Sequence, residues 1–458
     1  MTDLLNLPGY RVLKVAETDS QYTVLAETTD PKFPRCCLFP PAPYGTKRQC
    51  LRDTPSHGKF VDIWVKRRRV HCEHCDKYLY EELPQKAAGH RMTQRLFDMI
   101  VKEAKGKPFA EVARMVGMAD VTVRDVLNSH IDETLSDYSF PTPRVLGIDE
   151  KRLLGKYRAV VGNIETKTLL DMRPNRFKSH LGPYLDGLDK DRIEVVCQDM
   201  WADYREVVTK RLPKAVIVVD KFHVMMKAND AVEKFRRTLN AGMEKRERAK
   251  LKNQRKILLA RYGRITDQTK EKLEGWFARF PALEEVYWLK ERFYDFYDAQ
   301  TVEQAEARYR RWLGLLKPEY EPFFLDLTRC MGNWWPHIVS YFEHRYTNNY
   351  VESVNRIIDD LNRAGRGYEF EMIRAKALMT QGIHKTVHPK FVRGDGVSFF
   401  GPLPDFEEFS LGVDIDALGQ ALRLKYTEFT YDGDRQIATV HEGISILDRI
   451  AAEDAERV

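Results

Sequence analysis

Three carboxylates in this 458-residue chain stand where apolar segments end or on the polar face of a helix. Asp149 follows the apolar run Val145–Ile148, and Asp199 closes the run Ile193–Gln198. Glu352 lies on a predicted helix whose other face is apolar. Carboxylates that emerge together from apolar elements need a partner, and they supply the hard oxygen ligands that Mg²⁺ or Mn²⁺ prefers. Two such ions promote in-line displacement at phosphorus, so the set predicts phosphoryl transfer on nucleic acid.

Asp220 competes with Asp199 for the second place, because it also follows a short apolar strand, Ala215–Val219. The elements predicted after Pro143 run strand, strand, strand, helix, strand, helix, strand. This order resembles an α/β RNase H-like fold, in which the fourth strand pairs with the first and brings Asp199 beside Asp149. We therefore expect Asp199 to be the second catalytic aspartate, with Asp220 as the open alternative.

Two further polar residues share the helix face of Glu352. They are Asn355 and Arg356, and we predict supporting roles for both. Glu150 follows Asp149 directly on a strand, so its side chain is expected to point to the opposite face of the sheet and to be structural.

Five of the seven cysteines lie near the N-terminus: Cys36, Cys37, Cys50, Cys72 and Cys75. Without a secretion signal, this clustering favours metal binding over disulfides. Cys72 and Cys75 form a CxxC pair, and a tetrahedral Zn²⁺ site needs two more ligands. Adjacent cysteines are expected to diverge, so the zinc-binding subset stays open, with His71 and His74 as substitutes.

Three short helices are predicted after the cysteine-rich segment, in the pattern of a helix-turn-helix. Met92–Ala104 is apolar at helical spacing, and Phe109–Gly117 is a second helix that ends at its glycine. Asp120 is expected to cap the third helix. The outward face of that helix offers polar side chains for contacts with the phosphates and base edges of double-stranded DNA: Thr122, Arg124 and Asn128.

Basic residues cluster, although the formal net charge of +6 is modest. Within residues 245–256 we predict DNA contacts by Lys245, Arg246 and Arg248, and Arg67–Arg69 is a second basic cluster. The sequence has no apolar run of about 18 residues, the length that spans a bilayer. We therefore expect no membrane partner and a cytoplasmic location, associated with the bacterial nucleoid when bound to DNA.

Changes in composition divide the chain into six segments. We expect 1–83 to be a zinc-finger-like module, 84–140 a helix-turn-helix, 141–222 the first part of the catalytic core, 223–345 a helical insertion, 346–392 the glutamate helix and the following helix of the core, and 393–458 a C-terminal tail. The predicted fold class is an α/β RNase H-like core with an all-helical insertion, preceded by a small zinc-finger module and a helix-turn-helix. Within the insertion most tryptophans are expected in the core, with Trp334 or Trp335 as a candidate for stacking on an unpaired base.

Several blocks resemble the bacterial insertion-sequence transposases of the ISL3 family, over nearly the whole chain. They are residues 147–150, 198–204, 219–224 and 349–355. Gly365–Tyr368 is similar to the glycine-tyrosine turn after that family's glutamate helix. The resemblance implies a DDE catalytic core, an N-terminal zinc finger with a helix-turn-helix, and supporting roles for Asp220 and His223 in an Asp-x-x-His motif. Phe39 stands where a second CxxC cysteine is expected after Cys36.

The carboxylates and the resemblance together predict a transposase that binds terminal inverted repeats and uses Mg²⁺ or Mn²⁺ to cut and join DNA strands. They imply Zn²⁺ as a second metal, end and target DNA as partners, and a homodimer on DNA. Two alternatives are a transposase-derived DNA-binding regulator without cleavage activity and an RNase H-like nuclease that does not join strands. The presence of all three carboxylates argues against the regulator.

Overall fold

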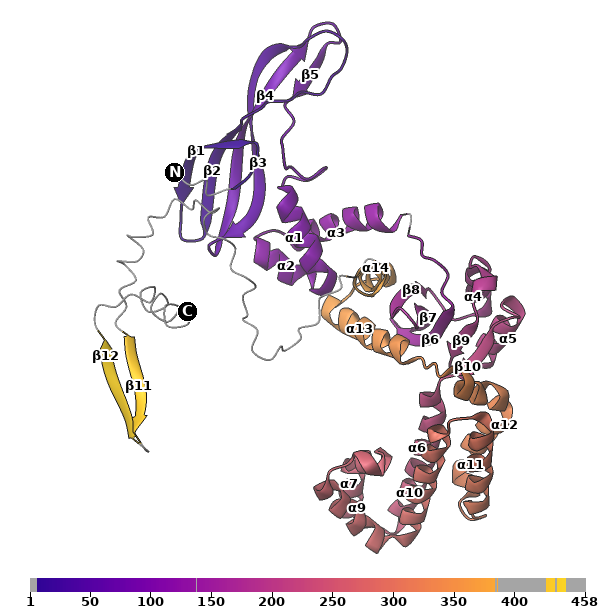
Figure 1. Ribbon diagram of the computed structural model, residues 1–458. Helices are drawn as coiled ribbons and strands as arrows, with labels where there is room; N and C mark the ends of the chain where they lie inside the picture. Colours follow the sequence, from indigo (N-terminus) through magenta and orange to yellow (C-terminus); the bar gives the residue numbers. More distant parts are fainter. Residues whose placement is uncertain (1–5, 137, 384, 386–425, 433–434, 442–458) are drawn as a thin grey trace, which may run out of the picture. The chain divides into compact units, whose positions relative to one another are not determined.

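The computed structural model describes residues 6–136, 138–383, 385, 426–432 and 435–441 (Figure 1). By internal contacts the chain divides into two compact units, Met1–Val387 and His388–Val458. None of the helices in the described ranges combines the length and the apolar composition needed to cross a lipid bilayer. All the site residues predicted from the sequence belong to the first unit.

A five-stranded sheet forms the N-terminal module, in the order β1-β2-β4-β3 with β5 paired to β4. Its strands are β1 (Tyr10–Glu17), β2 (Gln21–Thr28), β3 (Ala42–Ser56), β4 (Lys59–Cys72) and β5 (Lys77–Tyr80). β2 and β4 run parallel, and the other neighbours are antiparallel. Val61, Ile63 and Val65 are buried, as the alternation of side chains along a strand requires. β4 leads directly to the CxxC pair, because its last residue is Cys72.

Three helices follow, as the sequence predicts: α1 (Gln94–Gly106), α2 (Phe109–Val116) and α3 (Asp120–Leu135). The side chain of Thr93 caps α1. Gly117 ends α2 with a φ of 66°, a left-handed conformation that favours glycine. The prediction that Asp120 caps α3 is wrong, because Ala119 takes the cap position and the Asp120 carboxylate accepts a hydrogen bond from the next backbone amide.

Buried hydrogen bonds join the N-terminal sheet to the first of these helices. Asp53 of β3 is 1% exposed, and it accepts from the Thr93 hydroxyl at 2.6 Å and from Arg95 Nε at 2.8 Å. The backbone N–H of Thr93 also donates to the carbonyl of Arg52. Because a buried carboxylate requires such partners, these bonds fix the start of α1 against β3.

A second five-stranded sheet follows the three helices, in the order β10-β9-β6-β7-β8. Its strands are β6 (Val145–Leu153), β7 (Lys156–Asn163), β8 (Thr168–Arg173), β9 (Val195–Gln198) and β10 (Val216–Val219). β6, β7 and β8 are antiparallel, whereas β9 is parallel to β6 and β10 is parallel to β9. Ile148 pairs with Gln198, which pairs in turn with Val219. The residues that follow these three, Asp149, Asp199 and Asp220, therefore lie at adjacent positions across three strands, although β6 itself continues past Asp149 to Leu153.

Helices cover both faces of this sheet (Figure 1). They are α4 (Lys178–Asp186), α5 (Ala202–Arg211), α13 (Asn349–Gly365) and α14 (Phe370–Gln381). α4 and α5 pack on the face that carries Leu146, and α13 and α14 pack on the face that carries Val160. Since Asp149 pairs directly with Val160, its side chain faces α13. Glu150 faces the other side, as predicted.

The chain between β10 and α13 is helical. Its helices are α6 (Lys221–Thr238), α7 (Lys245–Asn253), α8 (Arg255–Leu259), α9 (Asp267–Arg279), α10 (Pro281–Tyr294), α11 (Val302–Leu315) and α12 (Glu321–His344), with short 3₁₀ turns between some of them. Trp276, Trp312 and Trp334 belong to the aromatic core of this region. Trp334 is only 7% exposed, and Trp335 packs 5.3 Å from the Tyr309 ring. The burial of Trp334 contradicts the hypothesis that it stacks on an unpaired base.

The described part of the second unit is an antiparallel hairpin of β11 (Tyr426–Asp432) and β12 (Arg435–His441). Asp432 pairs with Arg435 at its turn. The other residues of the predicted C-terminal tail, from 393 onward, lie outside the described residues.

Candidate active site and cysteine cluster

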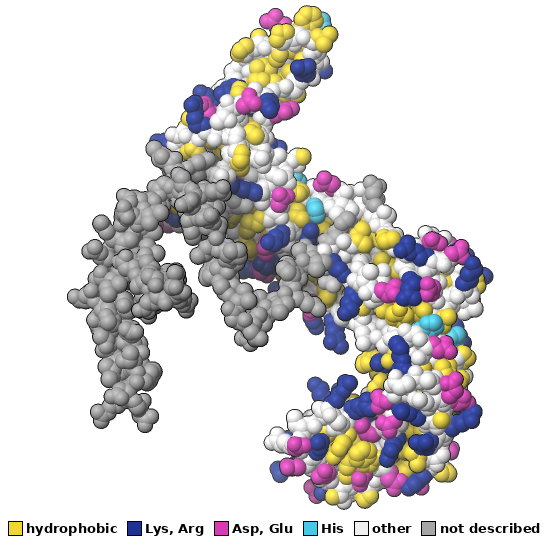
Figure 2. Space-filling view, viewed as in Figure 1, with side chains coloured by type: hydrophobic (Ala, Val, Ile, Leu, Met, Phe, Trp, Pro, Cys, Tyr) yellow, Lys and Arg dark blue, Asp and Glu magenta, His cyan; other side chains and the backbone are white. Residues whose placement is uncertain are grey.

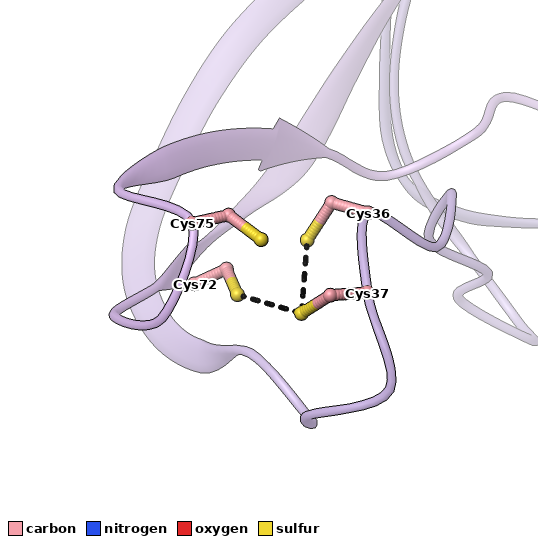
Figure 3. A group of neighbouring side chains, drawn as sticks. All are labelled: Cys36, Cys37, Cys72 and Cys75. Carbon is pink, nitrogen blue, oxygen red and sulfur yellow. Dashed lines mark hydrogen bonds between the residues drawn. The ribbon is translucent and has the colours of Figure 1, made fainter.

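Four cysteines of the N-terminal module bring their sulfur atoms together (Figure 3). The Sγ atoms of Cys36, Cys37, Cys72 and Cys75 all lie within 4.8 Å of one another. Cys72 ends β4 and Cys75 lies in the turn to β5, whereas the other two lie in the loop before β3. The expectation that adjacent cysteine side chains diverge is wrong here, because the chain bends at Cys36 and Cys37. Cys50, the fifth candidate, lies within β3 and outside the cluster.

The four thiols form a donor set that fits a tetrahedral zinc ion. The Sγ of Cys37 is 3.5 Å from the Sγ of Cys72 and 3.9 Å from that of Cys36. A hydrogen bond from the backbone of Cys75 is the main cause that lowers the pKa of the Cys72 thiol to about 7. Side-chain hydrogen bonds with Cys72 and Cys37 instead raise the pKa of the Cys36 and Cys75 thiols, so without a cation only part of the set favours the thiolate, the form that binds metal.

Two histidines beside the cluster have other contacts. His71 Nε2 lies 2.9 Å from a carboxylate oxygen of Asp76. The ring of His74 packs 4.6 Å from the ring of Phe39, the residue at the position where the resemblance predicts a cysteine. Cys37 supplies the fourth sulfur instead, so the cluster has four donors without either histidine.

Asp149 lies on β6 with its side chain toward α13 and is only 4% exposed. One carboxylate oxygen accepts from the backbone N–H of Glu150, and the other accepts from Asn355 Nδ2, each at 2.8 Å. Asn355 follows Glu352 by one turn of α13, so the helix that presents the glutamate also holds the aspartate. Arg356, the other predicted supporting residue on this helix, is exposed.

His223 on α6 lies between two of the predicted ligands. Its Nδ1 is 3.3 Å from Asp199 Oδ1, and its Nε2 is 3.8 Å from Glu352 Oε1. All three side chains are roughly three-quarters buried, with 25%, 24% and 21% exposed. The imidazole therefore spans the gap between the end of β9 and the first turn of α13.

Asp220 is fully buried at the N-terminus of α6. Its Oδ1 caps the helix by accepting from the backbone N–H of Phe222 at 3.4 Å, and its Oδ2 has no hydrogen-bond partner among the described residues. Ligand atoms of Asp220, His223 and Glu352 lie within 4.8 Å of one another. Both rival aspartates thus border the same histidine, and this geometry does not select Asp199 over Asp220.

Burial raises the pKa of these carboxyl groups. Burial and the nearby Asp199 and Asp220 raise the pKa of Asp149 to about 6. Burial and Asp220 raise the pKa of Glu352 to about 7, and burial raises the pKa of Asp220 as well. Carboxylates that repel one another in a partly dry site are stabilised by a bound cation. The donor set therefore fits Mg²⁺ or Mn²⁺.

Two buried amides beside the site escaped the sequence analysis. Gln198 is fully buried, and neither polar atom of its amide has a partner in the described part of the chain. Asn348 donates to the carbonyl of Ile148 at 3.1 Å, which leaves its Oδ1 unpartnered. Gly147 is needed there, because an added Cβ would lie 2.6 Å from Asn348 Oδ1. The sequence did offer one signal for this finding: Gln198, an amide residue, directly precedes Asp199 in an otherwise apolar strand.

The predicted DNA contacts lie on α3 and α7. Arg124 and Asn128 are exposed on α3, and Thr122 is half-exposed. The basic residues of α7 are exposed as well: Lys245, Arg246 and Arg248. Figure 2 shows basic and acidic side chains intermixed over the visible face of the helical region that contains α7. The positive charge there forms no continuous stripe on this face.

The second basic cluster has contacts within the N-terminal module. Arg67 donates to the carbonyl of Glu81 at 2.6 Å, and Arg68 pairs with the Glu81 carboxylate at 3.2 Å. The guanidinium of Arg69 lies 4.4 Å from the centre of the Tyr44 ring. All three guanidinium groups of this cluster are therefore engaged within the module.

Comparison with known proteins identifies the family. A model described as "Transposase", of the ISL3 DDE type, matches residues 146–377, and a model of the helix-turn-helix domain of transposase family ISL3 matches residues 81–131. A transposase for insertion sequence element IS1001 from Bordetella parapertussis is 23% identical over 326 residues, which cover 69% of this chain and 80% of the relative. A transposase for insertion sequence element IS1557 from Mycobacterium tuberculosis is 27% identical over 280 residues, which cover 55% of this chain and 63% of the relative. The first family model alone spans more than half of the sequence, and this chain belongs to the ISL3 family of transposases.

Proposed function

We propose that this chain binds the terminal inverted repeats of an insertion sequence, cuts DNA strands at its ends and joins them to a target. In this proposal Asp149, Asp199 and Glu352 hold Mg²⁺ or Mn²⁺. The observation that carries it is the convergence of these carboxylates around His223 and Asn355, in a member of a DDE transposase family. The raised pKa values of Asp149 and Glu352 support a site built for a cation.

We infer an RNase H-like core from the strand arrangement. Three antiparallel strands are followed by two that are parallel to the first, and the fourth strand pairs with the first. Asp149 lies on the first strand and Asp199 directly follows the fourth. This pairing supports Asp199 as the second ligand, because Asp149 and Asp199 directly follow Ile148 and Gln198, the last residues that β6 and β9 pair.

The residues around the carboxylates have distinct roles in this proposal. Asn355 orients Asp149 by donating to its Oδ2. His223 orients Asp199 and Glu352 from the start of α6. Arg356 is exposed on α13 and is placed to contact a phosphate of the bound strand. When bound, divalent cations would activate the attacking water or 3′-hydroxyl and stabilise the leaving 3′-oxygen.

DNA recognition is assigned to the helix-turn-helix and to α7 of the helical region. Thr122, Arg124 and Asn128 on α3 contact the inverted repeat, and Lys245, Arg246 and Arg248 on α7 contact the DNA backbone. Zn²⁺ held by Cys36, Cys37, Cys72 and Cys75 stabilises the N-terminal module, which is bonded to the start of α1. We expect two copies of the chain to act together, one at each end of the element.

Cleavage of end DNA by single-residue variants tests the catalytic proposal. The substrate is a duplex carrying the repeat that flanks the gene, with Mg²⁺ and a target plasmid. Asp149→Ala and Glu352→Ala should abolish strand cleavage and strand transfer while DNA binding stays nearly intact. Equal activity in these variants would contradict the proposal. Cleavage without joining by the unmodified chain would favour a nuclease, and binding without cleavage would favour a regulator.

A further inference from the structure

Lys376 of α14 is a buried cation in an unusual setting, being only 1% exposed. Its ammonium donates to the backbone carbonyl of Lys107 at 2.9 Å and to the Tyr368 hydroxyl at 3.0 Å. It also lies over two aromatic rings, 4.6 Å from the centre of Phe109 and 4.5 Å from that of Tyr368. Desolvation lowers its pKa to about 8. A charge buried at such a cost indicates a role beyond filling the core.

Besides Tyr368 in the turn before α14, Lys376 contacts two residues of the helix-turn-helix. Lys107 is the residue between α1 and α2, and Phe109 begins α2. α14 packs against α1 on one side and against β8 of the catalytic sheet on the other. α14 thus forms a direct bridge between the DNA-binding helices and the sheet that carries Asp149.

Tyr368 completes the contact by capping α2 from outside. Pro108 occupies the cap position of α2 and offers no side-chain hydrogen bond. The first backbone N–H of the helix, that of Phe109, donates instead to the Tyr368 hydroxyl at 3.2 Å. The two rings also pack with their centres 4.9 Å apart. The first backbone N–H of a helix in the DNA-binding domain is therefore satisfied by a residue of the catalytic region.

The position of Tyr368 is determined by the end of the helix that bears Glu352. α13 ends at Gly365, and the next residue, Arg366, has a φ of 44°. A Cβ on Gly365 would lie 2.1 Å from a ring atom of Tyr368, so only glycine permits this packing. The first turn of the same helix carries Glu352. A path of direct contacts therefore runs from the α1–α2 turn, through Tyr368 and along α13, to the carboxylate site.

The predicted DNA-reading face lies next to this contact. Arg124 and Asn128 of α3 line a cavity of about 400 Å³ together with Tyr368 and Met372. DNA bound by α3 would therefore lie beside the side chains that surround the contact between Tyr368 and α2. This placement gives DNA binding a physical route to α13.

We propose that Tyr368 and Lys376 form a latch that couples occupation of the helix-turn-helix by end DNA to the position of the Glu352 helix. They are positioning residues, because both act through backbone atoms of Lys107 and Phe109 and through α13 rather than on DNA. The latch refines the proposed function, since it restricts full activity to DNA that the helix-turn-helix has bound.

Two variants remove the polar interactions of the latch and keep side chains of similar size. Tyr368→Phe deletes the hydroxyl that caps α2, and Lys376→Met deletes the charge but keeps the chain length. Tyr350→Phe is the matched control, because its hydroxyl donates to the carbonyl of Gln381 at 3.3 Å within the catalytic region. Each latch variant should slow cleavage of end DNA about tenfold while its affinity for that DNA stays within about twofold. The control should show neither change.

Hydrogen exchange tests the latch independently of cleavage. The full chain is studied with its zinc retained and without Mg²⁺ or Mn²⁺, with a duplex that carries the repeat but stops before the cleavage point. This duplex should increase the protection of amides in α13 in the unmodified chain and in Tyr350→Phe, and leave α13 unchanged in Tyr368→Phe. Equal protection in Tyr368→Phe, or none in the unmodified chain, would overturn the latch. Normal coupling in a chain that never cuts DNA would instead refute the proposed function alone.

Discussion

The four cysteines of the N-terminal cluster lie between residues 36 and 75, whereas Asp149 and its partner Asn355 are separated by 206 positions. The cysteine cluster needs one hairpin turn and one neighbouring loop. The carboxylate site needs the parallel pairing of β6 and β9, together with two helices that follow the sheet in sequence. The first can form locally, but the second exists only when a whole domain has folded.

This difference has an energetic consequence. In small zinc modules the metal supplies folding free energy, because the isolated ligands do not hold their geometry. The carboxylate site is held in place by the apolar packing of α13 and α14 on the sheet. Removing a cysteine should therefore damage structure, whereas removing a carboxylate should damage chemistry and leave the fold intact. The predictions below test this contrast.

The largest expected effect separates the two rival aspartates. Asp199→Asn should slow end-DNA cleavage about a thousandfold, equivalent to about 4 kcal/mol of activation free energy, because it removes a metal ligand. Asp220→Asn should slow it only about tenfold, or about 1.4 kcal/mol. Asparagine also caps helices well, so the second variant keeps α6 intact and reports on the lost charge. Single-turnover cleavage rates measure both.

The same two variants, Asp199→Asn and Asp220→Asn, can contradict the choice of Asp199 as the second metal ligand. If Asp220→Asn is the more damaging variant and unfolds at the same temperature as the unmodified chain, Asp220 is the second ligand. The site would then use the group of Asp220, His223 and Glu352.

A smaller effect is expected at the cysteine cluster. Cys72→Ser should remove bound zinc and weaken end-DNA affinity about tenfold, because β3 and β4 support the start of α1 through Asp53. Cys50→Ser is the control, since Cys50 lies outside the cluster. Metal analysis and a DNA-binding titration measure the two results. Full zinc content in Cys72→Ser would show that the four sulfurs are not the ligand set.

The smallest expected effect is the pH dependence of the free energy of unfolding when Mg²⁺ and Mn²⁺ are absent. Asp149 and Glu352 have folded-state pKa values of about 6 and 7, above the ordinary values of 3.8 and 4.5. The folded chain therefore binds these protons more tightly than the unfolded chain. This stabilisation is complete below about pH 4 and is lost as the pH rises through about 7.

Thermal unfolding of the zinc-loaded chain without Mg²⁺ or Mn²⁺ measures this dependence. Relative to Glu352→Gln, the unmodified chain should lose on the order of a few degrees of melting temperature between about pH 5 and 8. Mg²⁺ should restore stability most strongly at the higher pH, because it binds the ionised carboxylates. Parallel pH profiles for the two proteins would contradict the raised pKa of Glu352.

The elements that carry the sites could be predicted where local patterns are strong. The strands that end before Asp199 and Asp220 are confirmed, and so are the three helices that precede the core sheet, whereas the strand expected to end at Asp149 continues to Leu153. β4 continues through Arg67–Arg69 as far as the first cysteine of the CxxC pair. Those arginines read as a basic cluster, yet they bond within the sheet.

Contacts between distant segments were beyond sequence reasoning. Nothing in the local pattern indicates that Asn355 bonds Asp149 or that Cys37 turns toward Cys72. The role of Tyr368 at the start of α2 depends on the packing of two domains. Each of these contacts depends on tertiary packing, which the spacing of residues along the chain does not predict.

The most direct test of the central claim is the position of manganese, read from its anomalous scattering in crystals of the chain soaked with Mn²⁺. We predict density between the carboxylates of Asp149, Asp199 and Glu352. Density confined to Asp220, His223 and Glu352, or no density near α13, would contradict this assignment.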